Sequence, residues 1–254
     1  MLRTRIIPCL QLIDDSLVKT VKFKKPSYIG DPINTVRIFN ELEVDELCFL
    51  DIRATLQNRS PNYKILSEIA NECFMPLSYG GAIKDELTAK KILSIGFEKI
   101  IINTAAIETP SLITRIAKHS GNQSVVVSID VKKSIWGSYW VYSKDGTRKH
   151  KIDPVKWAKQ AEEAGAGELL ITSMDNEGTW GGFDIEMIKG ISDSVSIPVI
   201  AHGGCGSLAD IGNAVKKGGA SAVGLGSLVV YQQKGMGVLV NFPDIDKLNK
   251  VLGI

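Results

Sequence analysis

Short apolar runs alternate with amphipathic stretches along the whole chain of 254 residues. Eight of these runs are strand-like, and most are continuous rather than alternating, as expected of strands buried on both faces. They are "RIIPCLQL", "ELCFLDI", "MPLSYGG", "KIIINTA", "SVVVSID", "GELLITS", "IPVIAHGG" and "SAVGLGS". Eight strand–helix units in about 250 residues predict a single α/β domain over residues 1–254, a (β/α)8 barrel of the TIM type. An open doubly wound sheet is the alternative.

Four helix starts can be read between the strands, each as a capping residue followed by proline. They are Asp31-Pro32, Ser60-Pro61, Thr109-Pro110 and Asp153-Pro154. One segment, at about 131–151, breaks the alternation with a strand-like "YWVYS" and a turn-like "KDG". It predicts a hairpin inserted after the fifth strand, where it would cover the C-terminal face of the barrel.

The chain also resembles itself at an offset of about 122 residues. "DELCFLDI" matches "AGELLITSMD", "MPLSYGGAI" matches "IPVIAHGGCG", and "GFEKIIINTAA" matches "GGASAVGLGSL". Because three pairs share one offset in the same order, we interpret the chain as two similar half-barrels rather than a coincidence of glycine-rich strand ends.

Composition narrows the class of protein. The net charge of +2 is scattered, so no nucleic-acid surface is indicated, and no apolar run approaches the roughly 20 residues of a membrane span. The N-terminus carries no signal-peptide pattern. The four dispersed cysteines indicate free thiols in a reducing compartment, with a hidden disulfide as the alternative, and the three histidines are too far apart for a recognisable metal site. We expect a cytoplasmic protein with no cofactor.

Glycine-rich turns follow four of the predicted strands. Gly80-Gly81 and Asn103-Thr104 follow the third and fourth strands, and Gly203-Gly204 and Gly226-Ser227 follow the seventh and eighth. Glycines and helix N-termini let backbone N–H groups approach anions, and the last two loops are the usual phosphate site of barrels. The two sets predict a substrate with phosphate at both ends; the alternative is that the glycines only make tight turns.

Polar residues stand at the ends of the other strands, on the face that hosts active sites in barrels. Gln11, Asp51, Asp130 and Asp175 are at or just beyond the first, second, fifth and sixth strands. Asp130 leaves the apolar "VVVSID" directly and is the main candidate for a general acid or base, with an ion-paired or capping role as the alternative. Asp51 and Asp175 could contact substrate or hold turns. Lys19, after the first strand, could close over a phosphate or be solvated.

Charged residues stand at the starts of four strands, at the opposite end of the barrel. They are Arg5, Glu46, Lys99 and Glu168. Buried charges are costly unless paired, so we expect a ring of ion pairs. The ring is either a structural plug or a gate through which a small polar molecule enters the barrel.

Several of these residues lie within motifs that are specific to one family. "RIIPCL", "GDP", "DELCFLDI", "INTAA", "VVVSID", "AGAGELLITSMDNEGT" and "GFDIEMI" resemble the HisF-type cyclase subunit of imidazole glycerol phosphate synthase, from residue 1 to about residue 230. The resemblance implies a barrel that receives ammonia from a HisH-like glutaminase docked at its N-terminal face, through a gate of the Arg5, Glu46, Lys99 and Glu168 type. It implies a phosphorylated small-molecule substrate at the C-terminal face, held by the residues above together with Thr179.

The departures from the family lie at the chemistry. The resemblance places the family's first catalytic aspartate at position 11, where this chain has Gln11. Ala82 stands in place of the third glycine of a phosphate turn, and His202 stands in place of a small residue. The C-terminal "GMGVLVNFPDIDKLNKVLGI" also differs from the family's last helix. Together these changes point to a specialised paralogue.

Three hypotheses follow. The first resembles the HisF-like proteins of surface-polysaccharide synthesis, such as that of lipopolysaccharide, in which ammonia converts an acetamido sugar to an acetamidino sugar with a separate sugar amidotransferase. The second is a histidine-pathway cyclase acting on the ribulosyl-formimino-carboxamide ribonucleotide. The third is a non-catalytic scaffold that only stimulates a glutaminase. Both enzyme hypotheses include Asp130, and Gln11 is the residue that separates them.

Overall fold

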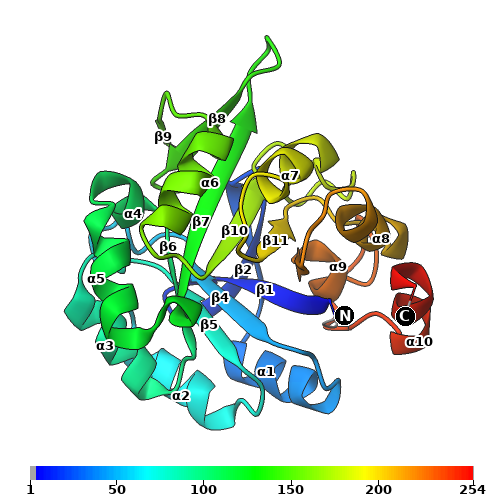
Figure 1. The fold of residues 1–254 in the computed structure, drawn as a ribbon. Coiled ribbons are helices and arrows are strands. Elements are labelled where there is room, and N and C mark those ends of the chain that lie inside the picture. Colours follow the sequence, from blue (N-terminus) through cyan, green and yellow to red (C-terminus); the bar gives the residue numbers. More distant parts are fainter. Residues whose placement is uncertain (1–3, 254) are drawn as a thin grey trace.

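The computed structural model describes residues 4–253, which form a closed (β/α)8 barrel (Figure 1). Its eight strands are parallel, and pairing of β12 with β1 and of β7 with β10 closes the sheet. The predicted barrel is therefore confirmed, and the open sheet is excluded because neither edge is left unpaired. The barrel strands are β1 (Arg5–Ile13), β4 (Leu47–Asp51), β5 (Leu77–Gly80), β6 (Lys99–Ile102), β7 (Val125–Lys133), β10 (Glu168–Ser173), β11 (Val199–His202) and β12 (Ala222–Leu225).

Helices surround the barrel, and most of them bury one face against it. They are α1 (Pro32–Glu41), α2 (Tyr63–Glu72), α3 (Glu86–Ile95), α4 (Thr104–Glu108), α5 (Ser111–Ser120), α6 (Pro154–Glu163), α7 (Ile185–Ser192), α8 (Leu208–Lys216), α9 (Ser227–Val230) and α10 (Ile245–Leu252), with a 3-10 turn, η1 (Asn122–Ser124). The divergent C-terminal segment ends in α10, which packs on the outside of α8 (Figure 1). Among the described residues, no helix is both long enough and apolar enough to cross a membrane.

The capping pattern located two of the four predicted helix starts. Asp31 and Asp153 cap α1 and α6, and a proline follows each as the first helical residue. The other two starts were predicted too early. Helix α2 begins at Tyr63, capped by Asn62, and α5 begins at Ser111 after Pro110. Thr109 instead ends the short helix α4, which the sequence pattern did not separate from α5.

The core has two layers, one between the strands and the helices and one inside the barrel. The inner layer is small and apolar, and it consists of Ile7, Cys9, Cys48, Ile101, Val126, Leu170, Ile200 and Ala222. All four cysteines are free thiols, as predicted, and three are buried. Since each barrel strand buries both faces, its side chains read as a continuous apolar run.

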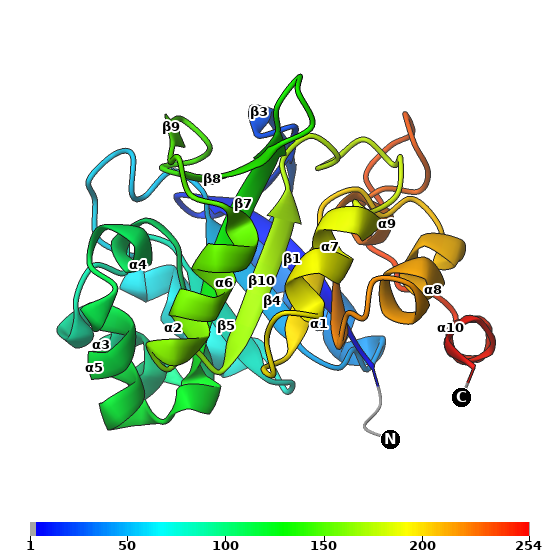
Figure 2. The same ribbon diagram turned by 45° about the horizontal axis from the view of Figure 1, so that its top comes forward.

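Two hairpins extend the barrel strands over the C-terminal face, at the top in Figure 2. Strand β1 continues antiparallel into β2 (Ser16–Val21) and β3 (Lys24–Gly30), and β7 continues into β8 (Tyr139–Ser143) and β9 (Arg148–Lys149). The β2–β3 hairpin was not predicted. Its turn places Lys22 and Phe23 at φ values of 54° and 60°, a conformation usually signalled by Asn-Gly.

Candidate functional site

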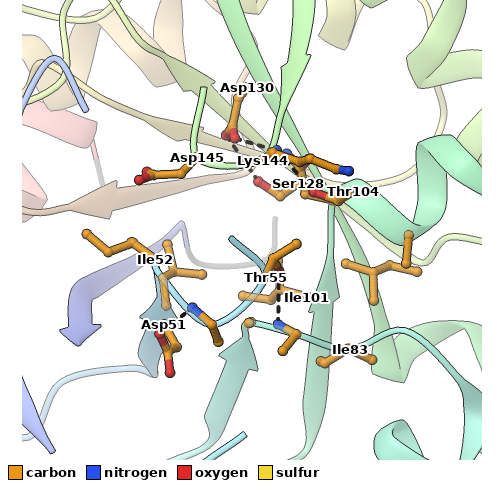
Figure 3. Close-up of a pocket in the computed structure, with 18 of the residues that line it drawn as sticks. Asp51, Ile52, Thr55, Ile83, Ile101, Thr104, Ser128, Asp130, Lys144 and Asp145 are labelled. Carbon is orange, nitrogen blue, oxygen red and sulfur yellow. Dashed lines mark hydrogen bonds between the residues drawn. The ribbon is translucent and has the colours of Figure 1, made fainter. Parts of the chain in front are cut away.

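A cavity of about 300 Å³ opens between the two hairpins at the C-terminal ends of the strands. It brings together seven of the predicted catalytic and binding residues, from five different strand ends: Gln11, Asp51, Gly80, Gly81, Asn103, Thr104 and Asp130. Figure 3 shows Asp130 and Lys144 along one side of it and Asp51, Thr55 and Ile83 along the other. The strand-end argument therefore located the cavity.

Asp130 projects from β7 into this cavity. Its Oδ2 accepts a hydrogen bond from Asn103 Nδ2 at 3.0 Å, and its Oδ1 accepts one from Ser128 Oγ at 3.5 Å. Burial, followed by repulsion from Asp145, raises the pKa of Asp130 to about 7, against the opposing effect of these two hydrogen bonds. At neutral pH the carboxyl group is thus poised both to give and to take a proton.

Hydrogen bonds to Thr20 and Glu177 hold the side-chain amide of Gln11 in place. Its Oε1 accepts hydrogen bonds from Thr20 N at 2.9 Å and Thr20 Oγ1 at 3.1 Å, and its Nε2 donates to Glu177 Oε1 at 3.4 Å. Glu177 also forms a buried ion pair with Lys19 and accepts a hydrogen bond from Phe23 N at 3.1 Å. Because Gln11 both donates and accepts, it serves as a connector between the β2–β3 hairpin and the loop after β10.

The same network changes the interpretation of Lys19. This residue lies in β2 rather than in a loop, and it is 6% exposed. Its Nζ also donates to Thr20 O at 2.8 Å, and its side chain lies against Gly226. Lys19 therefore stands beside one predicted phosphate turn, but its ammonium group is paired with Glu177.

His202 lies at the end of β11, buried at the base of the cavity. Its Nδ1 is 3.1 Å from Thr172 Oγ1. Burial, with the charge of Lys19 as a smaller cause, lowers the pKa of His202 to about 4. The imidazole is therefore neutral at physiological pH. A Cβ atom at Gly224 would lie 2.8 Å from Cys9 Sγ and 3.1 Å from His202 Cδ2, so these two side chains together leave room only for glycine.

Asp51 is engaged by its own loop. Its carboxylate accepts two hydrogen bonds from the Arg59 guanidinium at 2.8 Å each, and others from the backbone N–H groups of Arg53 and Ala54. Burial raises the pKa of Asp51, although Arg59 opposes the shift. This fully bonded carboxylate supports a role in positioning Arg59, which lines the cavity.

The predicted phosphate turns after the seventh and eighth strands, Gly203-Gly204 and Gly226-Ser227, do not line the cavity. A Cβ atom on Gly203 would lie 2.7 Å from Ser173 O, and one on Gly204 would lie 2.1 Å from Gly182 O. Close backbone packing therefore requires these two glycines, as the tight-turn alternative proposed. Ser227 begins α9 directly after Gly226, which is in contact with Lys19.

Asp175 and Thr179 hold the loop after β10 in shape. Asp175 Oδ2 accepts a hydrogen bond from Lys133 N at 2.9 Å, and Thr179 Oγ1 donates to Asn176 O at 2.7 Å. Neither lines the cavity. In this structure both residues have local partners that account for them.

Ala82 follows Gly80-Gly81 in a left-handed conformation with φ 51°. A side chain in this region is strained by about 1–2 kcal/mol, which glycine avoids. Since glycine also loses more chain entropy on folding, we expect Ala82→Gly to raise the free energy of unfolding by roughly 0.5–1 kcal/mol, measured by urea unfolding. The same change in a helix, Ala70→Gly, should lower it by about 1 kcal/mol. Equal losses at both positions would contradict the strain at Ala82.

At the other end of the barrel, the four predicted charges form a closed ring. Glu46 Oε2 lies 2.6 Å from Arg5 and 2.9 Å from Lys99 Nζ, while Glu168 accepts from Arg5 and, at 3.0 Å, from Lys99. Both glutamates are buried. Directly above the ring is an internal cavity of about 10 Å³, lined in part by Glu46 and Ser78. The ring thus closes the barrel interior at the N-terminal ends of the strands.

Sequence reasoning missed three acidic residues of the upper cavity, which are Glu108 in α4, Asp145 and Glu177. Glu177 lies in the loop after β10, two residues beyond the predicted Asp175, and Asp145 lies in the "KDG" segment, for which the sequence predicts only a turn. The signal for both was an acidic residue within a glycine-containing loop over the active-site face. Among the described residues, no group of three or more His, Cys, Asp or Glu side chains is arranged to hold a metal ion.

The chain is similar to known proteins over nearly its whole length. The family model described as "Histidine biosynthesis protein" matches residues 5–235. A Pseudomonas aeruginosa protein named "Putative imidazole glycerol phosphate synthase subunit hisF2" is 52% identical over 249 residues, which cover 98% of this chain and 99% of that protein. A Leptospira interrogans protein named "Putative imidazole glycerol phosphate synthase subunit HisF" is 47% identical, with 96% of each chain covered. A Vibrio vulnificus protein named "Putative imidazole glycerol phosphate synthase subunit hisF3" is 41% identical, covering 99% of this chain and 97% of that one.

Proposed function

The chain belongs to the histidine biosynthesis protein family, and from that premise we propose that it is an ammonia-using synthase subunit of the HisF type with a changed acceptor. A HisH-like glutaminase docks at the N-terminal face and releases ammonia into the barrel. The ammonia is added to an acceptor at the C-terminal face, in the formation of an acetamidino sugar for a surface polysaccharide. A separate sugar amidotransferase is a further partner.

The ring and the internal cavity support the ammonia route. Arg5 and Lys99 each bridge both glutamates, so four ion pairs close the ring and would have to separate for a molecule to pass. Above it the barrel interior is narrow and apolar, which suits a neutral ammonia molecule rather than ammonium. His202, near the upper end of this route, is uncharged at neutral pH because its pKa is lowered to about 4.

Gln11 is the single observation that carries the change of acceptor. A family cyclase has an aspartate here, and removal of a general acid or base typically costs about 10²–10⁴-fold in rate. In this chain the amide bonds Thr20 and Glu177 at once, so the position serves a structural network instead. The ammonia supply is thus kept while the first carboxylate of the cyclisation is absent.

Asn103 supports the binding of an acceptor with a hydrogen-bond donor. Its Nδ2 donates to Asp130, but its buried Oδ1 has no hydrogen-bond partner among the described residues. Buried polar atoms are nearly always hydrogen-bonded. An unpaired carbonyl oxygen at a cavity wall therefore suits an N–H or O–H group of the bound substrate. Thr104 and Gly80-Gly81 lie in the same cavity lining and suit the acceptor's phosphate.

Histidine-pathway cyclisation is the second candidate. It is favoured by Asp130, whose raised pKa of about 7 suits acid–base chemistry, and by the printed names of the relatives. The test supplies the purified protein with ammonium chloride and the ribulosyl-formimino-carboxamide ribonucleotide, and follows loss of the ribonucleotide. Turnover at the rate of an ordinary cyclase would overturn the sugar proposal. Amidination of an acetamido sugar, with both partners present, would support it.

Gln11→Asp tests the structural account of position 11. Aspartate would lose the hydrogen bond to Glu177 and place a second carboxylate beside it, which raises the pKa of one of the two. We expect this variant to lower the free energy of unfolding by about 1–3 kcal/mol at pH 8. Because the cost comes from the charged form, it should shrink as pH falls and the new carboxyl is protonated. Urea unfolding at pH 8 and pH 5 measures both.

The matched control is Gln11→Glu, which keeps the side-chain length and changes only the charge. It should show the same pH dependence as Gln11→Asp. If either variant were as stable as the parent at pH 8 and gained cyclase turnover, position 11 would be a dormant catalytic site rather than a connector.

A further inference from the structure

Asp145 lies at the tip of the turn between β8 and β9 and lines the same cavity as Asp130. The turn is fixed from two sides. Lys144 N donates a hydrogen bond to Thr104 Oγ1 at 3.1 Å, and a Cβ atom on Gly146 would lie 2.4 Å from Met174 Cε. The hairpin tip is therefore seated against the barrel mouth, and Asp145 has a defined position over the cavity.

The side chain of Asp145 is enclosed although it comes from a surface hairpin. It is 8% exposed, and its nearest cation is Arg53, with Nε at 3.7 Å. The neighbouring Lys144 offers no second cation, because its Nζ pairs with Glu108 at 3.4 Å. Burial therefore raises the pKa of Asp145 to about 6, with repulsion from Glu177 adding to the shift and Arg53 opposing it.

Asp145 and Asp130 line the same cavity, and Asp145 acts on Asp130 electrostatically. They come from different elements, β7 and the β8–β9 turn, and Figure 3 shows both on the same side of the cavity. Repulsion from Asp145 is one cause of the raised pKa of Asp130. Two carboxyl groups whose environments separate their pKa values are a recurrent basis for acid and base roles in one site.

We propose that Asp145 and Asp130 form the acid–base pair of this site, and that Asp145 replaces the carboxylate that Gln11 no longer supplies. The inference rests on the proposed function, since it assigns groups to the addition of ammonia. The resemblance to the family marks Asp130 and position 11 only; the second carboxyl comes from the geometry of the inserted hairpin.

The roles follow from the direction of proton movement. Ammonia attacks a carbon that carries a doubly bonded oxygen; the C–N bond forms as the C–O π bond opens. The oxygen takes a proton from neutral Asp130, and the new ammonium group gives one to ionised Asp145. In the second half the protons return: Asp145 protonates the departing hydroxyl, which leaves as water, and Asp130 takes a proton from nitrogen as the C=N bond forms. An amide and ammonia thus give an amidine and water.

The pair predicts a bell-shaped dependence of rate on pH. Activity should fall on the acid side as Asp145 is protonated, near its pKa of about 6, and on the alkaline side as Asp130 ionises, near its pKa of about 7. The other charged groups that influence the pair are Arg53 and Glu177. Arg53 lowers the pKa of Asp145 and Glu177 raises it, and the value of about 6 already includes both effects. Arg59, Lys144 and Glu108 also line the cavity, where Arg59 pairs with Asp51 and Lys144 pairs with Glu108.

Asp145→Asn is the decisive variant. Its backbone has φ 54°, which asparagine adopts at least as readily as aspartate, so the turn should be kept. The assay uses [15N]ammonium chloride with two acceptors in parallel, the ribulosyl ribonucleotide and a uridine-diphosphate-linked acetamido sugar, the latter with the glutaminase and amidotransferase partners. Rates are expressed per concentration of free ammonia, so that protonation of ammonia does not imitate the acid limb.

We expect Asp145→Asn to reduce incorporation of nitrogen about 10²–10⁴-fold and to abolish the acid limb near pH 6. The alkaline limb should move to lower pH, because the repulsion that raises the pKa of Asp130 is removed. The control is Asp15→Asn, an exposed carboxylate in the turn between β1 and β2, which should leave both rate and limbs unchanged.

The outcomes separate the inference from the function on which it rests. A rate within threefold of the parent, or a reduced rate with both limbs unmoved, overturns the role of Asp145 and leaves the proposed function intact. No turnover of either acceptor by the unsubstituted protein overturns the proposed function, and the inference with it. A lost acid limb together with a collapsed rate supports the pair.

Discussion

Asp130→Asn is expected to collapse turnover while making the protein more stable at pH 8. The loss of rate should reach about 10²–10⁴-fold, because an amide can neither give nor take the proton. The gain in stability has a separate cause. Burial, with repulsion from Asp145, raises the pKa of Asp130 to about 7, whereas an unfolded chain has an aspartate pKa of about 3.9.

The sign follows from these two pKa values. The folded state prefers the protonated carboxyl, so this preference favours folding fully below pH 4 and is lost as pH rises through 7. At pH 8 the parent protein bears the whole cost of an ionised carboxylate in the cavity. Asparagine has no such cost, and we expect the free energy of unfolding of the variant to exceed that of the parent by about 2–4 kcal/mol.

Urea unfolding at several pH values measures this difference. It should vanish near pH 4, grow between pH 4 and pH 7, and remain constant above. Asp15→Asn is again the control, since its exposed carboxylate should give no pH-dependent difference. Asp130→Asn also tests the scaffold hypothesis. Unchanged sugar amidination with this variant would favour a scaffold that only stimulates a glutaminase.

Arg5→Ala is expected to cost more stability than any exposed ion pair of this protein. The substitution leaves Glu46 and Glu168, both buried, with Lys99 as their remaining cation. Removal of one partner from a buried pair typically costs about 3–5 kcal/mol. Since the Arg5 side chain is itself 29% exposed, we expect roughly 2–4 kcal/mol, measured by urea unfolding.

Arg37→Ala is the matched control. Arg37 also pairs with a glutamate, Glu72 at 2.9 Å, but its side chain is 59% exposed. A surface pair contributes less than about 1 kcal/mol. Equal losses for the two variants would show that the ring adds no more to stability than a surface pair, and would weaken its interpretation as a tightly closed gate.

Arg5→Ala also tests the proposed ammonia route through a measurement of activity. With the HisH-like partner and glutamine, Arg5→Ala should lower the amount of product formed per glutamine hydrolysed. With ammonium chloride in place of glutamine, its product formation should match that of the parent. A loss of equal size with both nitrogen sources would point to a damaged acceptor site rather than a damaged gate.

The sequence predicted most of the frame of this protein. Apolar runs located all eight barrel strands, since a strand buried on both faces must be apolar along its length. Strand ends then placed Gln11, Asn103 and Asp130 at one cavity, and strand starts placed Arg5 and Lys99 in one ring. In a closed parallel barrel each of these relations is a consequence of position along the chain.

The partners of those residues could not be predicted, because they come from loops whose paths no local pattern specifies. The β2–β3 turn has Lys22 and Phe23 where Asn-Gly would have announced a hairpin, so the burial of Lys19 against Glu177 went unseen. Likewise, "KDG" predicts a turn, but these three residues do not indicate that the turn lies over the cavity.

The sequence by itself thus determined the barrel, its two chemically distinct ends and the amide, Gln11, at the end of the first strand. Only the tertiary structure decided which groups Gln11 bonds and which carboxyl groups share a cavity with Asp130. The physical reason is that a hydrogen bond or a shifted pKa depends on the distance and burial of groups far apart in the chain. Gln11 and Glu177 are 166 residues apart and meet only once the barrel has closed and both hairpins are seated.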